Sequence, residues 1–198
     1  MSEQPRVGVG KNFSMQSTRK RKESDFYETP YSMTERLLTR ERFGKSVLEP
    51  ACGNGAIVNV LAKNGYEVVA YDKETNFLKD KNAYTAMITN PPYSLSSQFI
   101  LHAKNIVKHK FALLLPLSYL HGKKRFDTIW CDSIFPLKCI YVFTRYPMLG
   151  DALRDDGKYR TGMMVYAWFI WDKYHNAEPT IQWIDNDADV LGSTDEIK

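Results

Sequence analysis

Short apolar runs alternate along this chain with segments of helical spacing, and this alternation restricts the possible folds more than any other feature. The expected strands are Ser46–Leu48, Tyr66–Tyr71, Tyr84–Thr89 and Phe111–Leu115. Helices are expected from near Ser32, over Ala56–Lys63 and Ser96–Val107, and in part of Ser118–Trp130. Strands of this kind are typical of a mostly parallel sheet that is covered on both faces. We therefore expect an α/β domain.

Local signals set the expected ends of these elements. Ser32-Met33-Thr34-Glu35 places a hydroxyl three residues before a glutamate, which predicts a capped helix start. Asn64-Gly65 predicts the end of the second helix. Cys139–Phe143 and Met163–Trp171 are two further apolar segments, and we expect them to form an antiparallel pair. The prediction is a mostly parallel sheet of about six to seven strands with an antiparallel closing strand.

The charges of the chain are concentrated at its two ends. Residues 1–24 hold six basic and two acidic residues, whereas residues 185–198 hold five acidic residues and one lysine. We expect a flexible basic arm over 1–24, one catalytic domain over 25–184 and an acidic tail over 185–198. The arm could contact phosphates, or it could be a solvated tail.

The composition argues against a membrane protein and a disulfide framework. The longest apolar runs, Phe111–Leu117 and Met163–Trp171, are too short to cross a bilayer, and the N-terminus resembles no signal peptide. Cys52, Cys131 and Cys139 form no CxxC pair, so we expect free thiols, no metal site and a cytoplasmic location.

A glycine turn follows the first expected strand, in the stretch Glu49-Pro50-Ala51-Cys52-Gly53-Asn54-Gly55. Glycines at a strand–helix turn allow a ligand to approach the main chain, and Asp72 follows the next strand, where an acid commonly accepts hydrogen bonds from ribose hydroxyls. Glu49 would repel a phosphate, so the turn suits an uncharged or cationic ligand. The other interpretation is an ordinary β–α turn.

Two consecutive prolines end the strand Tyr84–Thr89 in the sequence Asn90-Pro91-Pro92-Tyr93. If this strand lies beside Ser46–Leu48, the Asn90 side chain lies beside the glycine turn. Its amide oxygen and a proline carbonyl could accept both hydrogens of an amino group, while Tyr93 offers a ring for stacking. The other interpretation is a proline-rich turn in which Tyr93 only packs.

The two motifs together resemble the S-adenosylmethionine-dependent amino-methyltransferases, in particular phage-type DNA N6-adenine methyltransferases. Glu49–Gly55 is similar to the cofactor loop of that family, Asn90–Tyr93 to its catalytic tetrapeptide, and Phe26–Pro30 to the segment over the methionine end of the cofactor. The later segments Leu114–Arg125, Ile140–Arg145 and Ala167–Lys173 also resemble the family. The resemblance covers residues 25–184 and implies a Rossmann-like class I methyltransferase fold.

The resemblance also implies functional residues. The expected catalytic residues are Asn90, Pro91, Pro92 and Tyr93. The expected cofactor-binding residues are Tyr27, Thr29, Pro30, Glu49, Ala51, Gly53, Gly55, Asp72, Asn76, Phe77 and Asn90. This sequence departs from the family pattern in two places. About 17 residues separate Asp72 from Asn90, which shortens the helix and strand usually found between them. Asn76 stands where the family often has an acid.

DNA is the expected partner, bound in a host cytoplasm if the chain is phage-encoded. The expected phosphate contacts are His121, Lys123, Lys124, Arg125, Arg145, Arg154, Lys158 and Arg160, although each could be ordinary solvated surface. We expect no separate recognition domain, so a partner protein could assist target recognition. Methylation of RNA adenine, of protein glutamine or of cytosine N4, and a catalytically silent subunit, are the alternatives.

Overall fold

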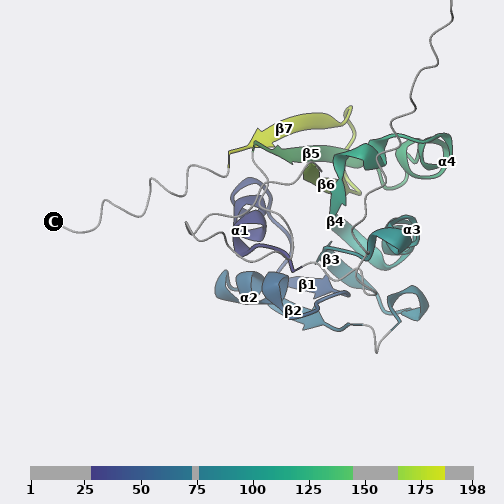
Figure 1. Cartoon of the computed structure of the whole chain (residues 1–198). Coiled ribbons are helices and arrows are strands. Elements are labelled where there is room, and N and C mark those ends of the chain that lie inside the picture. Colours follow the sequence, from purple (N-terminus) through teal and green to yellow (C-terminus); the bar gives the residue numbers. More distant parts are fainter. Residues whose placement is uncertain (1–27, 73–75, 145–164, 186–198) are drawn as a thin grey trace, which may run out of the picture.

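The computed structural model describes residues 28–72, 76–144 and 165–185 of the chain (Figure 1). The predicted arginine and lysine contacts at positions 145, 154, 158 and 160, as well as Tyr27, lie outside these residues. The strands are β1 Ser46–Glu49, β2 Glu67–Ala70, β3 Tyr84–Thr89, β4 Val107–Pro116, β5 Leu137–Phe143, β6 Tyr166–Asp172 and β7 Thr180–Ile184. The helices are α1 Tyr31–Arg40, α2 Ala56–Lys63, α3 Ser96–Ile106 and the single turn α4 Lys123–Arg125.

The strands form one seven-stranded sheet in the order β2-β1-β3-β4-β6-β5-β7. Every neighbouring pair is parallel except the two that β6 makes with β4 and β5. The α/β prediction with a mostly parallel sheet is therefore confirmed. The predicted antiparallel pair is β5 with β6, although β6 lies inside the sheet rather than at its edge. The edge strand beyond β5 is β7, which the sequence pattern did not predict.

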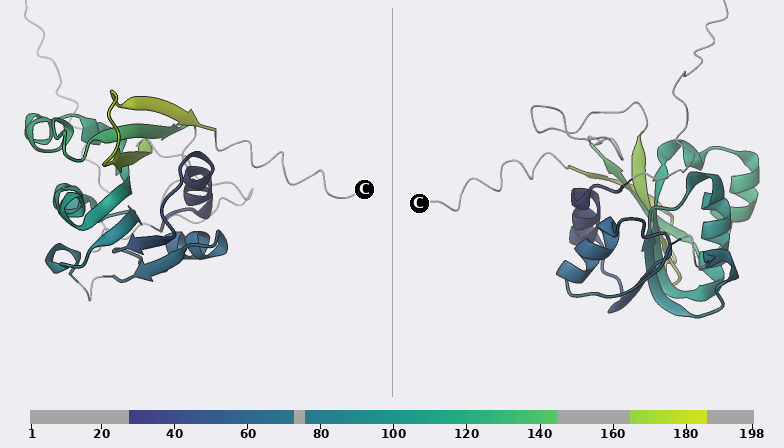
Figure 2. Two further views of the ribbon diagram at one scale, coloured as in Figure 1. Left: turned by 180° about the vertical axis from the view of Figure 1, so that it is seen from behind. Right: turned by 60° about the horizontal axis from the view of Figure 1, so that its bottom comes forward.

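Helices cover both faces of the sheet (Figure 2). On one face, α1 and α2 pack against β1, β3 and β4 through Met33, Leu37, Ile57 and Leu61. On the other face, α3 packs through Phe99 and Ile100, joined by the π-helical turn η4 Phe126–Trp130. Because the central strands are covered on both faces, they are apolar throughout, which explains their near-continuous hydrophobic sequence.

The first helix begins at Tyr31, close to the predicted start near Ser32, but without the predicted cap. Pro30 is the N-cap residue of α1, so Ser32 lies inside the first turn, and no side chain caps this end. Pro30 has φ −56° and ψ 134°, so it lies outside the helix, which begins at the next residue. The start and end predicted for α2 are confirmed, with Gly65 in the left-handed region at φ 82°.

The connection between β2 and β3 is short, as the spacing of Asp72 and Asn90 predicted. Its described part contains the single 3₁₀ turn η1 Phe77–Lys79, and β2 forms an edge of the sheet. The segment expected to be helical in part contains the 3₁₀ turn η3 Leu117–Leu120, α4 and η4.

A buried ion cluster joins the end of α1 to the amino ends of β4 and β5. Glu41, which is 3% exposed, accepts hydrogen bonds from Lys110 at 2.8 Å, from Lys138 at 2.8 Å and from the Tyr141 hydroxyl at 2.9 Å. Burial alone would raise the pKa of Glu41, but hydrogen bonds from the two lysines hold it below its ordinary value. This carboxylate is therefore ionised and fully compensated.

Candidate active site at the carboxyl edge of the sheet

The glycine turn and the Asn90–Tyr93 loop meet because their strands are neighbours. β1 and β3 pair in parallel, with Leu48 opposite Met87, so both strands end at the same edge of the sheet. The segments that follow them, Ala51–Asn54 and Asn90–Tyr93, then line one cavity, whereas the predicted cofactor residue Gly55 lies outside its lining. The condition set by the sequence, that the strand before Asn90 lies beside the strand before the glycine turn, is met.

The turn after β1 requires glycine at two positions. Gly53 and Gly55 have φ angles of 48° and 83°, in the left-handed region where a Cβ atom causes strain. The turn is closed by a hydrogen bond of 2.7 Å from the Gly55 amide to the Cys52 carbonyl, and Gly55 is the N-cap of α2. The main chain is therefore bare on the side that faces the cavity.

Glu49 supports this turn from beneath rather than from the cavity wall. Its side chain is 0% exposed, and Oε1 accepts hydrogen bonds from the Ala51 amide at 2.9 Å and the Thr89 hydroxyl at 2.6 Å. Within the described part of the chain, Oε2 has no hydrogen-bond partner. Burial raises the pKa of the Glu49 carboxyl to about 8, and the two hydrogen bonds offset this in part. Glu49 is therefore protonated at neutral pH.

Asn90 is oriented by a residue far away in the sequence. Its Nδ2 donates a hydrogen bond of 3.0 Å to the hydroxyl of Thr29, which is 5% exposed and lies just before α1. This contact fixes the orientation of the Asn90 amide, with Nδ2 directed at Thr29. The predicted cofactor residue Thr29 therefore also positions the predicted catalytic residue.

The cavity at this edge has a volume of about 90 Å³ and draws its lining from four segments. Its lining residues are Glu28, Thr29, Ala51, Cys52, Gly53, Asn54, Ala56, Ile57, Asp72, Asn90, Pro91, Pro92 and Tyr93. Two of them, Glu28 and Asp72, carry carboxylates, and the described lining contains no lysine or arginine. The cavity therefore favours a cationic ligand over a phosphate, in keeping with the expectation from the glycine turn.

Five lining residues were missed by the sequence interpretation. Glu28, Cys52 and Asn54 lie beside predicted residues in the same short motifs, so the motifs themselves could have identified them as lining residues. Ala56 and Ile57 form the first turn of α2, and a helix that starts at the cavity must present its first turn to it.

Other predicted cofactor residues lie outside the lining of this cavity. Asn76 accepts a hydrogen bond of 3.1 Å from the Leu78 amide and so caps η1. Phe77 is buried, with its ring 4.6 Å from that of Phe99. Pro30 caps α1 and is buried. Cofactor contacts from these residues remain predictions.

Tyr93 begins the 3₁₀ turn η2 Tyr93–Leu95, directly before α3. Its ring centroid lies 5.5 Å from that of Tyr166, the first residue of β6, with the planes inclined by 35°. The Leu95 amide donates to the Pro92 carbonyl at 2.8 Å. Tyr93 is thus held between the cavity and a second aromatic ring, which fixes the orientation of the proposed stacking surface.

The predicted basic segment after β4 divides into structural and exposed residues. Arg125 donates from Nε to the Tyr119 carbonyl at 2.8 Å, donates from Nη2 to the His121 carbonyl, and places its guanidinium 4.6 Å from the centre of the Tyr119 ring. The Tyr119 hydroxyl is 2.5 Å from that of Ser97 in α3. Arg125 therefore holds this segment against α3, and internal contacts occupy its guanidinium.

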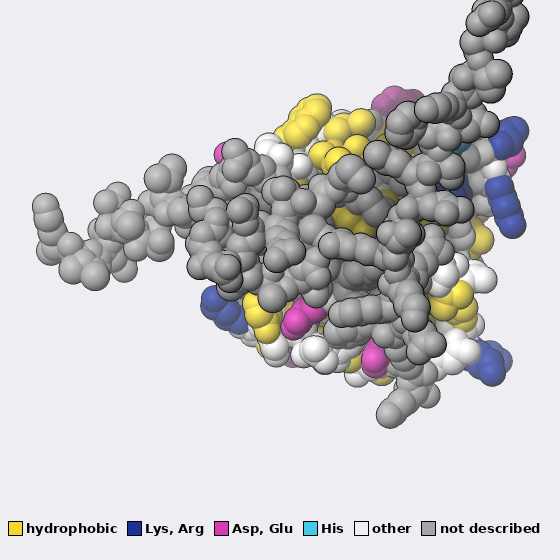
Figure 3. Space-filling model, viewed as in Figure 1, with side chains coloured by type: hydrophobic (Ala, Val, Ile, Leu, Met, Phe, Trp, Pro, Cys, Tyr) yellow, Lys and Arg dark blue, Asp and Glu magenta, His cyan; other side chains and the backbone are white. Residues whose placement is uncertain are grey.

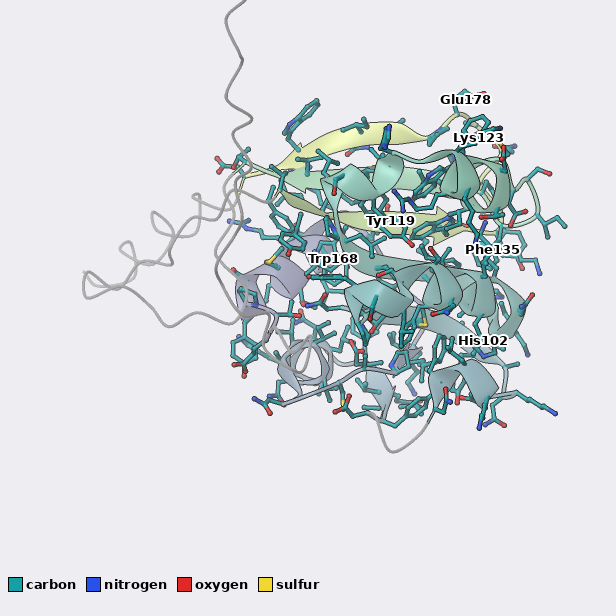
Figure 4. The ribbon with its side chains drawn as sticks, turned by 45° about the vertical axis from the view of Figure 1, so that its right-hand side comes forward. His102, Tyr119, Lys123, Phe135, Trp168 and Glu178 are labelled. Atoms are coloured by element: carbon teal, nitrogen blue, oxygen red, sulfur yellow. The ribbon has the colours of Figure 1, made fainter. Side chains whose placement is uncertain are left out.

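The remaining side chains of this segment face solvent. Lys123 is exposed and forms an ion pair of 2.6 Å with Asp127, and Figure 4 shows it on the outer surface beyond Tyr119. His121 and Lys124 are also exposed. Phosphate contacts from these three residues remain predictions, since an exposed ion pair contributes little and exchanges readily.

The described residues contain neither a membrane-spanning helix nor a cluster of metal-binding side chains. No helix in the described ranges has the length and apolar character needed to cross a membrane. The same residues contain no group of three histidine, cysteine, aspartate or glutamate side chains that could hold a metal ion.

Comparisons with known proteins agree on the fold. No protein-family model and no curated protein sequence matches the chain. A Listeria monocytogenes structure described as a class I S-adenosylmethionine-dependent methyltransferase is similar with a TM-score of 0.52 and 13% identity, over 83% of this chain and 69% of that protein. A Lactococcus lactis structure described as a hemolysin is similar with a TM-score of 0.50 and 14% identity, over 82% and 95%. The chain has the Rossmann-like fold of class I methyltransferases.

Proposed function

We propose that this protein transfers the methyl group of S-adenosylmethionine to the N6 amino group of adenine in DNA. The observation that carries the proposal is the placement of Asn90. Its amide lies at the carboxyl end of β3, is oriented by Thr29 and lines the same cavity as the glycine turn. An oriented amide acceptor beside a cofactor-type turn is what transfer to an amino group requires.

The residues of the cavity fit S-adenosylmethionine. Gly53 leaves the main chain open to a ligand, and Asp72 lies where ribose hydroxyls could be bound. The carboxylates of Glu28 and Asp72 suit a cationic sulfonium. Because ligand pockets commonly measure roughly 300–1,000 Å³, a cavity of about 90 Å³ would enclose one end of the cofactor and leave the remainder in the open cleft.

When bound, S-adenosylmethionine supplies an electrophilic methyl group. The chain's own task is to prepare the amino group, whose lone pair is delocalised into the adenine ring. Asn90 Oδ1 and a proline carbonyl, which we assign to Pro91, would accept hydrogen bonds from its two N–H groups and favour a pyramidal nitrogen. The nitrogen lone pair would then form the new N–C bond as the bond from the methyl group to the sulfonium breaks; S-adenosylhomocysteine would leave, and the extra proton would pass to water. Catalysis of this kind depends on positioning and electrostatics rather than on a strong base.

The substrate base must leave its stack to reach Asn90. Unstacking costs a few kcal/mol in a duplex, and stacking on Tyr93 offsets part of this cost. Reading of the surrounding sequence would fall to exposed loops such as His121–Arg125, or to a partner protein. Since a short loop offers few bidentate contacts, we expect a short or degenerate target and strong dependence on salt.

Methyl transfer from labelled S-adenosylmethionine to duplex DNA, single-stranded DNA and RNA tests the proposal, with mass spectrometry of the nucleosides as readout. We expect N6-methyladenine in DNA, with more transfer to single strands. Adenine in RNA presents the same amino group, so methylation confined to RNA would replace the substrate but keep the mechanism. Methylation of cytosine or of protein glutamine would overturn the assignment of the substrate, and no transfer to any acceptor would overturn the activity.

A further inference from the structure

The strand β7 is an open edge of the sheet with an unusually apolar sequence. Among the described residues it pairs with β5 alone, and its first four residues, Thr180–Trp183, are exposed. Ile181 is 52% exposed and Trp183 is 63% exposed. A strand edge presents a row of backbone donors and acceptors to any second strand, so an apolar edge of this kind is a docking surface.

The opposite edge of the sheet is protected against such pairing, whereas β7 is not. The edge strand β2 begins at Glu67, which forms an exposed ion pair of 2.6 Å with Lys45. In β7, the sequence Thr-Ile-Gln-Trp-Ile contains no charged residue and no proline. Charged side chains and prolines are the usual means of blocking edge pairing. The strand β2 therefore contains a charged residue, whereas the proline and the charge nearest to β7, Pro179 and Asp185, lie just outside the strand.

The two exposed apolar side chains of β7, Ile181 and Trp183, lie on one face and continue an apolar groove. Ile181 and Trp183 are register partners of Ile140 and Val142, which belong to the core beneath α3 and η4. Ile181 also lines a groove of about 510 Å³ between β7 and η4, together with Leu120, Phe126 and Trp130. Figure 3 shows hydrophobic side chains gathered over β7. A partner strand beside β7 would therefore find apolar surface on this face.

The sequence of β7 is complementary to itself. A two-fold axis perpendicular to the sheet joins the same edge of two copies, makes their strands antiparallel and keeps equivalent faces together. With Gln182 opposite Gln182 of the second copy, each Ile181 lies opposite the other copy's Trp183, on the same face. This register joins all five residues and forms two aromatic–β-branched cross-strand pairs, which are among the stabilising pairs in antiparallel sheets.

The charges that flank β7 also favour this arrangement. The tail that follows the strand carries five acidic residues and one lysine over positions 185–198. Antiparallel pairing sends the two tails away from opposite ends of the joined strands, whereas parallel pairing would place them side by side. Like charges at close range oppose association, so only the antiparallel arrangement keeps the tails apart.

We propose that two copies of this chain associate through antiparallel pairing of their β7 strands, with Ile181 of each copy packed against Trp183 of the other. The arrangement joins the two sheets into one continuous sheet, in which the β7 strand of neither copy is an open edge. It uses none of the residues that line the candidate active site, so it stands or falls independently of the proposed methyl transfer.

Light scattering after size-exclusion chromatography, over a range of protein concentrations, measures the association. We expect the full chain to form a dimer, and Trp183→Lys to be a monomer that keeps the circular dichroism of the parent. The matched control is Val69→Lys, which places the same charge at an exposed position of the other edge strand and should leave the dimer intact. A monomer at every concentration, or equal loss with both variants, would overturn the proposal.

Engineered cysteines test the register. In a Cys131→Ser background, which removes the exposed native thiol, Gln182→Cys should form a disulfide between copies under mild oxidation, because position 182 faces itself. Thr180→Cys should not, because it faces Ile184 of the other copy. Crosslinking of Thr180→Cys in preference to Gln182→Cys would contradict the proposed pairing.

Discussion

Glu41 and Glu49 are two buried carboxyl groups at opposite ends of the same sheet, and their surroundings differ. Glu41 has two lysines and a tyrosine hydroxyl as donors, and its pKa is held below the ordinary value by the lysines despite burial. Glu49 has a hydroxyl and one amide, and burial raises its pKa to about 8. Glu41 is therefore an ionised carboxylate with basic partners, whereas Glu49 is protonated at neutral pH and accepts its two hydrogen bonds from uncharged donors. Perturbed pKa values of the second kind cluster at functional sites.

The first prediction concerns the carboxyl edge of the sheet, where Glu49 lies, and tests for a loss of activity without a loss of cofactor binding. Asn90→Ala removes the proposed acceptor for the amino group, and we expect methyl transfer to fall by about 100- to 1,000-fold or more, the range found for single groups that stabilise a transition state. Cofactor binding should stay within a few-fold, measured by calorimetry. Asn105→Ala, at an exposed position of α3, is the control and should keep full activity. Near wild-type turnover in Asn90→Ala would remove Asn90 from catalysis.

The second prediction concerns the other end. Glu41→Gln leaves Lys138 without its carboxylate and Lys110 with Asp172 alone, at 3.3 Å. We expect the free energy of unfolding to fall by about 3 kcal/mol, since breaking a buried ion pair is strongly destabilising. Cofactor affinity, measured on the folded protein, should be unchanged because Glu41 lies away from the cavity. Denaturant titration measures the loss. A variant as stable as the parent would mean that the ion cluster makes no net contribution to the free energy of unfolding.

The third prediction weakens the cofactor site without touching Asn90. Asp72→Ala should reduce the binding free energy of S-adenosylmethionine by about 1.5–3 kcal/mol, the range for hydrogen bonds to a charged group. Asp72→Asn, which keeps an acceptor oxygen, should lose less. Calorimetric titration gives both values. Normal binding by Asp72→Ala would move the ribose contact to another residue.

The fourth prediction uses pH to contrast the two glutamates. Between its ordinary pKa of 4.5 and about 8, Glu49 holds a proton in the folded state that the unfolded chain releases. Stability should therefore fall as pH rises through this window, by at most about 1.4 kcal/mol per pH unit. Glu49→Gln should abolish this slope. Glu41 has the opposite sign, because a lowered pKa gives stability that is present above pH 4.5 and lost as the pH falls below it.

Denaturant titrations of the parent, Glu41→Gln and Glu49→Gln at a series of pH values measure these slopes. The parent and Glu49→Gln should converge near pH 4.5 and diverge toward pH 8, with the variant the more stable at high pH. Parallel profiles for these two proteins would show that Glu49 is ionised in the folded state.

The sequence predicted the parts of the fold that rest on periodicity. The bounds of α2 and β3 were predicted to the residue, because both are marked by clear turns and strong apolar patterns. The strand β7 was missed because it has no buried apolar run: its first four side chains are exposed, and the alternation Thr-Ile-Gln-Trp covers only four residues. The predicted cap of α1 was wrong, because Pro30 rather than Ser32 is the N-cap residue and no side chain caps this end.

For the site, the sequence identified the two motifs but not how they are held. The pairing of β1 with β3 places Gly53 and Asn90 in one cavity, as the motif spacing predicted. The contact between Thr29 and Asn90 spans 61 residues, and no local pattern signals it. The internal role of Arg125 was also hidden, because a basic residue in a loop has the same sequence signature whether it binds phosphate or its own backbone.

The most direct test of the account is calorimetric titration of S-adenosylmethionine into the parent, Gly53→Val and Gly65→Val. Both glycines adopt left-handed angles, so the two variants carry similar backbone strain, but only Gly53 lines the cavity. We predict one S-adenosylmethionine per chain for the parent and for Gly65→Val, and loss of binding in Gly53→Val. A parent that does not bind, or a Gly53→Val variant that binds as tightly as Gly65→Val, would contradict the placement of the cofactor at the carboxyl edge of the sheet.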